Sequence, residues 1–339
     1  MTEQMPRRVR IRDVAELARV DPAVVSKIVN GSERLSVRPE TRARVLEAVK
    51  VLNYRPNAMA RSLRTARSDT IGLLIPDFTN PIYASIIQGA QRAAAARGQL
   101  VLTASVDRED SIPLALERLG NGRLDGLLVA EVPSSPSAYR EIRSLGLPWL
   151  LLNRRTTASH RYVILDDEGA TKMAVDHLAR LGHRVVAHLA GPSSADTAAR
   201  RKAGFRSAMA AHGLSVRRQH LVEADYTYEG GFAAMAELLA RPPRPTAVVV
   251  ANVASAIGAL RAARVVGVKV PEELSVVSIH DLSLATYLDP PLTTVRMPVE
   301  QLGERGIEIL SNLSPDDRVE EVVPGPMELV VRASTASIA

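Results

Sequence analysis

The sequence predicts a small all-α domain at the N-terminus, followed by an α/β core with two parallel-sheet lobes. Three observations lead to this prediction. Excess positive charge is confined to the first fifth of the chain, and the same segment spaces its apolar residues as short helices do. From residue 70 onward, short apolar runs alternate with helix-length amphipathic segments, the pattern of parallel sheets covered by helices. A chain of 339 residues is long enough for two or three folding units.

The charge distribution separates a basic N-terminal segment from a near-neutral body. Residues 1–70 carry 15 Lys and Arg against 8 Asp and Glu, whereas the rest of the chain carries 28 against 29. A compact basic segment of this kind favours binding to a polyanion. Charge alone fits a solvated basic tail equally well, so the pattern of residues within the segment has to decide.

Several classes of protein are disfavoured by what the sequence lacks. There is no cysteine, which excludes disulfides, thiolate metal sites and thiol nucleophiles. No apolar run approaches the roughly 20 residues of a membrane-spanning helix, and residues 1–19 are too charged for a signal peptide, so we expect a cytoplasmic protein without a membrane contact. No phosphate-binding loop, dinucleotide fingerprint or nucleophile elbow is present, so we expect neither an enzyme nor a cofactor.

The histidines give no metal site either. His177, His183 and His188 show no accompanying pattern of carboxylates, and we expect them on helix surfaces or in turns.

The basic segment predicts a helix-turn-helix. Ile11, Val14, Ala15 and Ala18 follow the spacing of one helical face. Asp21-Pro22 then supplies an N-cap and a favoured first helical residue, so a second short helix should run from Pro22 to Val29 and stop at Asn30-Gly31. A third helix, from about Pro39 to Leu52, can close a small core. Two short helices joined by a tight turn are typical of a DNA-binding unit whose second helix enters the major groove.

The second helix offers short side chains suited to base edges. Ser26 and Asn30 can donate and accept hydrogen bonds, Ala23 can meet a thymine methyl group, and Lys27 can bind a guanine or a phosphate. The candidates for DNA contact on this helix are Pro22, Ala23, Ser26, Lys27 and Asn30. The alternative interpretation is that these residues form the solvent-exposed face of a small helical bundle.

The motifs of this segment resemble, in order, those of the lactose-repressor (LacI/GalR-type) family of bacterial transcription regulators. They are Asp13-Val14-Ala15, Val25-Ser26-Lys27, Asn30-Gly31-Ser32, Pro39-Glu40-Thr41-Arg42, Asn53-Tyr54-Arg55-Pro56-Asn57 and Ala60-Arg61-Ser62-Leu63. The resemblance implies a headpiece that reads the major groove and a hinge helix, from about Asn57 to Leu63, that lies in the minor groove. It places Asn57, Ala58, Arg61 and Leu63 at the DNA, with Leu63 wedged between base pairs.

The proposed hinge also makes physical sense. About seven residues are too few for a stable isolated helix, so this segment should become helical only when a second copy and DNA hold it. Arg61 suits the negative potential of a narrow minor groove.

The core contains ten candidate strands and several amphipathic helices. The strands are Thr70–Pro76, Leu100–Val106, Gly126–Val132, Trp149–Asn153, Tyr162–Leu165, Val185–Ala190, Leu221–Ala224, Ala247–Ala251, Ser275–Ile279 and Thr294–Met297. The helices include Tyr83–Arg97, Gly169–Leu181, Arg200–His212, Glu229–Ala240 and Ala254–Val266. Ten strands are many for one sheet, so we expect two lobes of five or six strands each.

We expect the chain to cross to the second lobe near residue 160 and to return near residues 290–293. The predicted domains are a headpiece at 1–56, a hinge and linker at 57–69, and a core at 70–339. Within the core, the first lobe takes about 70–160 and 293–320, and the second about 161–292 and 321–335.

The core motifs extend the resemblance. Pro76-Asp77-Phe78-Thr79-Asn80-Pro81, Leu181-Gly182-His183, Arg201-Lys202-Ala203-Gly204-Phe205 and Pro291-Leu292-Thr293-Thr294-Val295 are similar to those of the same family. The resemblance implies a bilobal core like that of periplasmic sugar-binding proteins, which binds an effector between its lobes and dimerises side by side.

Ligands of open parallel sheets lie beyond the carboxyl ends of the strands, so the loops there are the candidate effector site. Planar polar groups and aromatic rings in these loops suit the hydroxyls and apolar faces of a carbohydrate. The loops contain Asp77, Phe78, Asn80, Arg154, Tyr226, Asn252, His280 and Asp281, with Tyr83 just beyond the first. By resemblance, Arg201 is the arginine that contacts the effector, and Tyr226 and Asn252 are further pocket positions. Phe78 and Tyr83 could equally be packing residues, and Arg201 could instead form a surface ion pair.

Two departures from the family pattern fall in these loops. Asn252-Val253 stands where Asn-Asp is usual, and His280-Asp281 where Asp-Asp is common. The loss of a carboxylate at each position suggests an effector unlike the common neutral sugars.

These inferences lead to a prediction of function. We expect a homodimeric repressor that binds a pseudo-palindromic DNA operator and responds to a small carbohydrate-like effector. A solute receptor without DNA activity would fit the core alone, but it would not explain the basic head. An enzyme would need a catalytic motif that the sequence does not contain.

Overall fold

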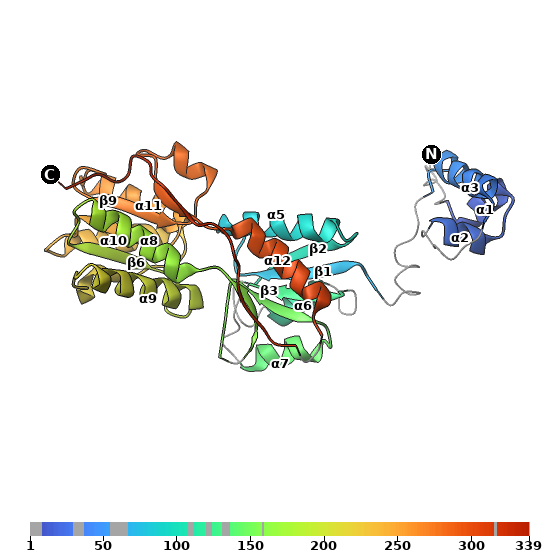
Figure 1. Cartoon of the computed structure of the whole chain (residues 1–339), viewed down its shortest axis with the longest axis horizontal. Coiled ribbons are helices and arrows are strands. Elements are labelled where there is room, and N and C mark those ends of the chain that lie inside the picture. Colours follow the sequence, from blue (N-terminus) through green and yellow to red (C-terminus); the bar gives the residue numbers. More distant parts are fainter. Residues whose placement is uncertain are drawn as a thin grey trace, which may run out of the picture. The chain divides into compact units, whose positions relative to one another are not determined.

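The computed structural model describes residues 9–29, 37–54, 67–106, 112–119, 124–130, 136–157, 159–314 and 317–338. Contacts between residues divide the chain into two compact units, Met1–Ser68 and Asp69–Ala339 (Figure 1). The N-terminal unit is all-α and the second unit is α/β, as predicted from the sequence.

The N-terminal unit is a small helical bundle. Its helices are α1 (Ile11–Ala18), α2 (Pro22–Val29) and α3 (Pro39–Val51). They enclose one apolar cluster, formed by Val14, Ala15, Ala18, Val25, Ile28, Val45 and Ala48. The predicted helix-turn-helix is therefore confirmed, with α3 closing its core.

The turn between α1 and α2 is set by local sequence. Arg19 ends α1 in the left-handed region with φ 55°, and its N–H donates to the carbonyls of Ala15 and Glu16. The Asp21 carboxylate then accepts a hydrogen bond from the Ala23 N–H at 2.7 Å, as an N-cap does. With Pro22 at the first helical position, this cap fixes where α2 begins.

The second unit contains two six-stranded sheets. The first has the order β11-β5-β4-β3-β1-β2, and the second β12-β10-β9-β8-β6-β7. The strands of the first are β1 (Thr70–Ile75), β2 (Leu100–Ser105), β3 (Gly126–Val129), β4 (Trp149–Leu152), β5 (Arg161–Ile164) and β11 (Val319–Val322). Those of the second are β6 (Val186–Ala190), β7 (Leu221–Glu223), β8 (Ala247–Val250), β9 (Ser275–Ile279), β10 (Thr293–Arg296) and β12 (Glu328–Val330). All neighbouring strands are parallel except β12, which runs antiparallel to β10.

Helices cover both faces of each sheet (Figure 1). They are α5 (Ile82–Ala95), α6 (Ile112–Arg118), α7 (Pro136–Ser144), α8 (Asp167–Arg180), α9 (Asp196–Ala211), α10 (Tyr228–Ala240), α11 (Val253–Val265) and α12 (Val299–Asn312). In the first lobe, α5 and α12 pack on one face and α6 and α7 on the other. In the second, α8 and α9 lie opposite α10 and α11. The central strands are buried on both faces, which is why they read as unbroken apolar runs.

The lobe boundaries differ from those expected. β5 pairs with β4, so the first crossing follows Ile164 and does not lie at residue 160. β10 pairs with β9 in the second sheet, so the chain returns after Arg296 and not at residues 290–293. The expected boundary at 320/321 falls inside β11, which pairs with β5. Local patterning identifies a strand, but which sheet it joins depends on pairing between distant segments, and this explains the errors.

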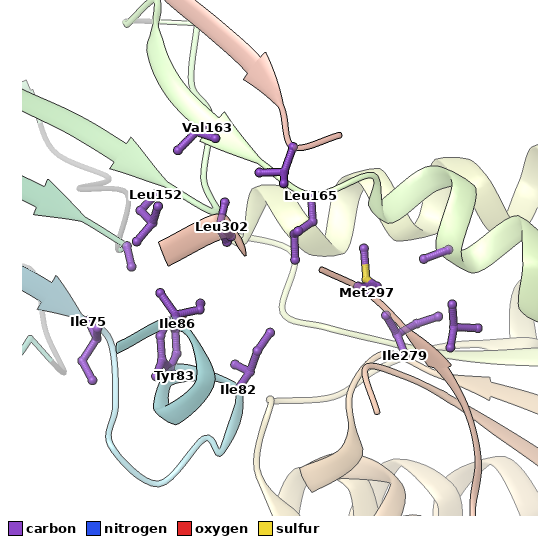
Figure 2. Close-up of a cluster of buried hydrophobic side chains, with 14 of the residues drawn as sticks. Ile75, Ile82, Tyr83, Ile86, Leu152, Val163, Leu165, Ile279, Met297 and Leu302 are labelled. Carbon is purple, nitrogen blue, oxygen red and sulfur yellow. The ribbon is translucent and has the colours of Figure 1, made fainter. Parts of the chain in front are cut away.

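One apolar cluster extends across both lobes. Tyr83, Ile86 and Leu302 belong to helices of the first lobe, and Ile279 and Met297 lie at strands of the second (Figure 2). All five side chains are buried. The two lobes therefore share packed surface at the crossing, beside the ends of the strands where a ligand would bind.

Glycines allow α5 and α12 to pack closely in the first lobe. A Cβ at Gly89 would lie 1.9 Å from the Glu300 carbonyl oxygen, and one at Gly303 would lie 2.0 Å from the Ile86 carbonyl oxygen. Both contacts are with backbone atoms, which cannot move without separating the helices.

We therefore predict that Gly89→Ala destabilises the core. Forcing an extra carbon into this contact should lower the free energy of unfolding by about 1–3 kcal/mol, measured by urea denaturation. Gln88→Ala, at an exposed neighbouring position of α5, is the control and should change stability little. Equal stability of the two variants would contradict the close helix contact.

Candidate functional site

The predicted DNA-contacting face of α2 is accessible. Ala23 and Lys27 are exposed, and Pro22 and Ser26 are half-buried. Val25 and Ile28, on the opposite face, are buried in the core of the bundle. The helix therefore presents the residues expected to read bases, and their contact with DNA stays a prediction.

The other predicted DNA-binding residues lie outside the described part of the chain. They are Asn30, Asn57, Ala58, Arg61 and Leu63. The hinge helix at residues 57–63 likewise remains a prediction from the sequence.

A cavity of about 170 Å³ lies between the two lobes, at the carboxyl ends of their strands. Asp77, Asn80 and Tyr83 reach it from the segment after β1, and Arg154 from the loop after β4. The second lobe contributes Ser194, Ala195 and Asp196 at the start of α9, and Tyr226 and Thr227 after β7. Acceptors, hydroxyls, a guanidinium and two aromatic rings thus converge on one small space.

The structure brings only some of the predicted effector residues to this cavity. Asn80, Tyr83 and Tyr226 line it. Phe78 is 58% exposed and is not among the lining residues, whereas Arg201 is buried with 2% of its surface exposed. Sequence reasoning missed Ser194 and Asp196 because it began the helix at Arg200 instead of Asp196. It also missed Thr227, the N-cap of α10, beside the predicted Tyr226.

Arg201 belongs to a buried ion cluster beneath the cavity. Its Nε donates to an oxygen of the Asp167 carboxylate at 2.7 Å, and its Nη1 donates to the Ala251 carbonyl at 2.6 Å. Arg200 also pairs with Asp167, and all three side chains are at most 3% exposed. Burial raises the pKa of Asp167, but the charges of Arg201 and Arg200 outweigh it and hold that pKa below its usual value.

His280 lies next to this cluster as a neutral base. Because a guanidinium only donates, the Arg201 contact at 3.3 Å makes the His280 Nε2 an acceptor and leaves the proton on Nδ1. The Nδ1 is buried and has no hydrogen-bond partner among the described residues. Burial, together with the Arg201 charge, lowers the pKa of His280 to about 3.

Asn252 and Asp281 have internal roles. The Asn252 side chain caps α11 by accepting from the Ser255 N–H at 2.9 Å, and its amide donates to the Tyr226 carbonyl at 3.2 Å. The Asp281 carboxylate accepts from Thr294 at 2.7 Å and binds Arg296 and Arg332. Neither residue, nor His280, is among those that line the cavity.

Polar contacts join the two lobes at the wall of the cavity. Arg154 donates to the Tyr83 hydroxyl at 3.2 Å and to the Thr197 hydroxyl of α9 at 3.4 Å. The neighbouring Arg155 binds Asp196 through its backbone N–H at 3.1 Å and its Nε at 3.3 Å. These hydrogen bonds join the loop after β4, in the first lobe, to the first turn of α9, in the second. A ligand bound between the loop and α9 would therefore contact both lobes.

The expectation for the remaining histidines was wrong. His177, His183 and His188 are buried rather than on surfaces, at 7%, 3% and 0% exposed. His183 binds the Thr246 and Ser275 hydroxyls, His177 binds Thr335, and His188 lies in β6. The sequence around His177 and His183 gives no sign of these hydroxyl partners, which lie far along the chain.

The described residues contain neither a metal-binding cluster nor a membrane-spanning helix. No group of three or more His, Asp or Glu side chains there could hold a metal ion. None of the helices in that part of the chain is both long and apolar enough to cross a membrane.

Comparison with known families accounts for both units. The family described as "Bacterial regulatory proteins, lacI family" matches residues 10–57, and "Periplasmic binding protein-like domain" matches residues 175–335. The chain is 34% identical to the ribose operon repressor of Escherichia coli K12 over 88% of this chain and 91% of that protein. It is 33% identical to the HTH-type transcriptional regulator CelR of Thermobifida fusca, over 96% of each chain.

Solved structures give the same result. The lac repressor dimer bound to operator and the anti-inducer ONPF is 28% identical, with a TM-score of 0.83, over 97% of this chain and 99% of that one. The complex of the transcriptional regulator CelR with cellobiose is 30% identical, with a TM-score of 0.73, over 96% of this chain and all of that one.

The buried histidines predict a loss of stability in mild acid. Burial lowers the pKa of His188 to about 4 and that of His280 to about 3, whereas both titrate near 6.5 when unfolded. Below pH 6.5 the unfolded chain takes up these protons first, so the free energy of unfolding should fall from pH 6.5 towards pH 4.

Replacing His280 should reduce this slope. Asn tolerates the left-handed φ of 70° found at this position, so His280→Asn removes the ionisable group without straining the backbone. Unfolding of the variant should take up as much as one proton fewer. Between pH 6 and 5 its free energy of unfolding should therefore fall by up to about 1.4 kcal/mol less per pH unit. Urea denaturation at several pH values measures it. An unchanged slope in the variant would contradict a neutral buried His280.

Proposed function

Since the chain belongs to the lacI family of bacterial regulatory proteins, it is a DNA-binding transcriptional repressor and not an enzyme, and we propose that a small carbohydrate-like effector bound between its lobes controls its affinity for DNA. The observation that carries the proposal is the cavity between the lobes, whose walls come from both of them. The N-terminal helical unit, Met1–Ser68, which we call the head, supplies the DNA-binding part. A solute receptor without DNA activity would leave that unit unexplained.

The head supports recognition of a specific DNA sequence. Ala23, Ser26 and Lys27 lie on one accessible face of α2, and their side chains match groups displayed in the major groove. Helix-turn-helix dimers bind two half-sites, so we propose a pseudo-palindromic operator. The proposed hinge residues, Asn57 to Leu63, would add contacts in the minor groove at its centre.

The cavity supports a polar, hydroxylated ligand. Asp77 and Asn80 offer oxygen acceptors to hydroxyls, and the rings of Tyr83 and Tyr226 offer apolar faces. A relative named for the ribose operon and another solved with cellobiose support a carbohydrate or a derivative of one. The volume of about 170 Å³ suits a small effector.

The contacts between the lobes supply a route from effector to DNA. Arg154 and Arg155 hold the loop after β4 to Thr197 and Asp196 of α9. A ligand that contacts both lobes favours one of their arrangements over another, and only this difference in affinity can shift the DNA-binding equilibrium. We propose that the effector releases DNA by changing how the paired lobes align the two hinge segments.

Exposed apolar side chains support a homodimer. Leu100 and Leu102 on the edge strand β2 are 68% and 44% exposed, and Tyr287 in the second lobe is 83% exposed. Exposed apolar residues on a sheet edge often mark an interface. A related protein has been solved as a dimer on its operator, and we propose the same assembly here.

Selection of DNA from a random pool by the purified full-length protein tests the proposal. We expect enrichment of one pseudo-palindromic sequence, and the enriched duplex then serves to test release by sugars and sugar derivatives. Failure to prefer any duplex over random competitor, with or without these compounds, would overturn the proposal.

We predict that Lys27→Ala weakens binding to the selected operator. Loss of a base contact should cost about 1–3 kcal/mol and relax the preference at one position, as measured by fluorescence anisotropy. Lys50→Ala removes another exposed lysine, from α3, and serves as the control. If both variants bind as the unmodified protein does, Lys27 does not contact the DNA.

A further inference from the structure

We propose that a pocket at the amino edge of the first sheet binds a small molecule that carries two linked phosphoryl groups. The pocket has a volume of about 470 Å³ and lies where β4, β5 and β11 begin. These three parallel strands are neighbours, so their amino ends share one edge of the sheet. The cavity between the lobes lies at the carboxyl ends of the strands, and the pocket is therefore a separate site.

Three arginines from separate parts of the chain line this pocket. The end of α7 contributes Arg143, the start of β5 contributes Arg161, and the segment before β11 contributes Arg318. The pairing of β5 with β4 and β11 brings these segments together. Because the three residues are far apart in the sequence, no local motif indicates the cluster.

Within the described part of the chain, no carboxylate pairs with any of the three guanidiniums. Arg143 and Arg318 are exposed, and neither forms an ion pair or a side-chain hydrogen bond there. Neutral groups hold Arg161 instead, since its Nε donates to the Asp317 carbonyl at 3.0 Å and its Nη2 to the Ser314 carbonyl at 3.3 Å. All three positive charges are thus available to an anion in the pocket.

The nearby carboxylates have other partners. The Asp317 carboxylate, which also lines the pocket, accepts from a backbone N–H at 2.7 Å in the turn before β11. Glu320 pairs with His160 and accepts from the Tyr162 hydroxyl, and these hydrogen bonds, with a smaller effect from the Arg318 charge, hold the pKa of Glu320 below its usual value. The lining therefore has three guanidiniums against one carboxylate, which favours an anion.

The arrangement of the charges favours linked phosphoryl groups over a single anion. A guanidinium binds two phosphoryl oxygens in parallel, and arginines on several segments match a ligand whose charge is also distributed. The volume lies in the range of about 300–1,000 Å³ that is typical of small-molecule sites. Leu147, Pro148 and Trp149 add apolar surface to the lining. The Arg161 guanidinium lies 5.9 Å from the centre of the Trp149 ring, which helps to fix its position.

Titration calorimetry of the full-length protein with pyrophosphate, inorganic phosphate and citrate tests this proposal. The basic head also attracts polyanions, so the comparison between variants decides the outcome. Arg143→Gln and Arg318→Gln should each weaken pyrophosphate binding about five- to thirtyfold, because each removes a charge-assisted contact. Arg264→Gln, at an exposed position of α11 in the second lobe, is the control and should bind pyrophosphate as the unmodified protein does.

A second pair of variants tests the pocket without removing an arginine. Gly146 lines the pocket with φ 63°, a value that Asn and Asp both tolerate, and a Cβ there would meet no atom within 4 Å beyond its chain neighbours. Gly146→Asp adds a negative charge and should weaken pyrophosphate binding about tenfold or more, whereas Gly146→Asn should change it less than about threefold.

Pyrophosphate binding that is unchanged in both arginine variants, or equal in Gly146→Asp and Gly146→Asn, would overturn the proposal. Binding of citrate or inorganic phosphate as tight as that of pyrophosphate would overturn it as well. Weaker DNA binding by Arg143→Gln and Arg318→Gln, with pyrophosphate binding unchanged, would assign these arginines to DNA and contradict the proposal.

Discussion

The core depends on one buried carboxylate, Asp167, which pairs with two buried arginines close to the segment that crosses between the lobes. Asp167 begins α8, just after the chain has left the first sheet, and it pairs with Arg200 and Arg201 of α9. Arg200 also donates to the Leu165 carbonyl at 2.8 Å, on the segment that crosses between the lobes. Buried charges are tolerated only when they are paired and hydrogen-bonded, so this cluster fixes the crossing segment against α9.

The location of the cluster explains the character of the cavity above it. Because Arg201 and His280 are used within the floor, the walls are left to side chains from the loops, chiefly Asp77, Arg154 and Tyr226. Arg154 reaches from the first lobe to Thr197 on α9 of the second, so a residue that lines the cavity also joins the lobes. A ligand that contacted Arg154 would therefore act on the hydrogen bonds that join the lobes, which is the coupling that the proposed control of DNA binding requires.

Much of the fold could be predicted from the sequence because its signals are local. Apolar spacing and the Asp21-Pro22 cap located the first two helices, and unbroken apolar runs located ten strands. The edge strand β11 was missed because it alternates partly buried and exposed residues and carries Glu320 and Glu321. β12 is only three residues long and contains one apolar pair after Glu328.

The site was harder to predict because its chemistry depends on long-range pairing. Nothing near Asp167 in the sequence indicates that Arg200 and Arg201 are its partners. Asp281 has the residue type and position of a ligand contact, yet Arg296 and Arg332 use its carboxylate. The loops at the strand ends could be identified from topology, whereas the direction of each side chain required the structure.

The unfolding of Asp167→Asn tests most directly whether this carboxylate holds the core together. Trp149 is the only tryptophan of the chain and lies in the first sheet, so its fluorescence follows unfolding of the core in urea. Leaving the buried Arg201 without a carboxylate, and Arg200 with Asp196 alone, should lower the free energy of unfolding by about 3–5 kcal/mol, whereas Glu168→Gln, at the exposed neighbouring position, should change it little. A loss below about 1 kcal/mol in Asp167→Asn would contradict the account.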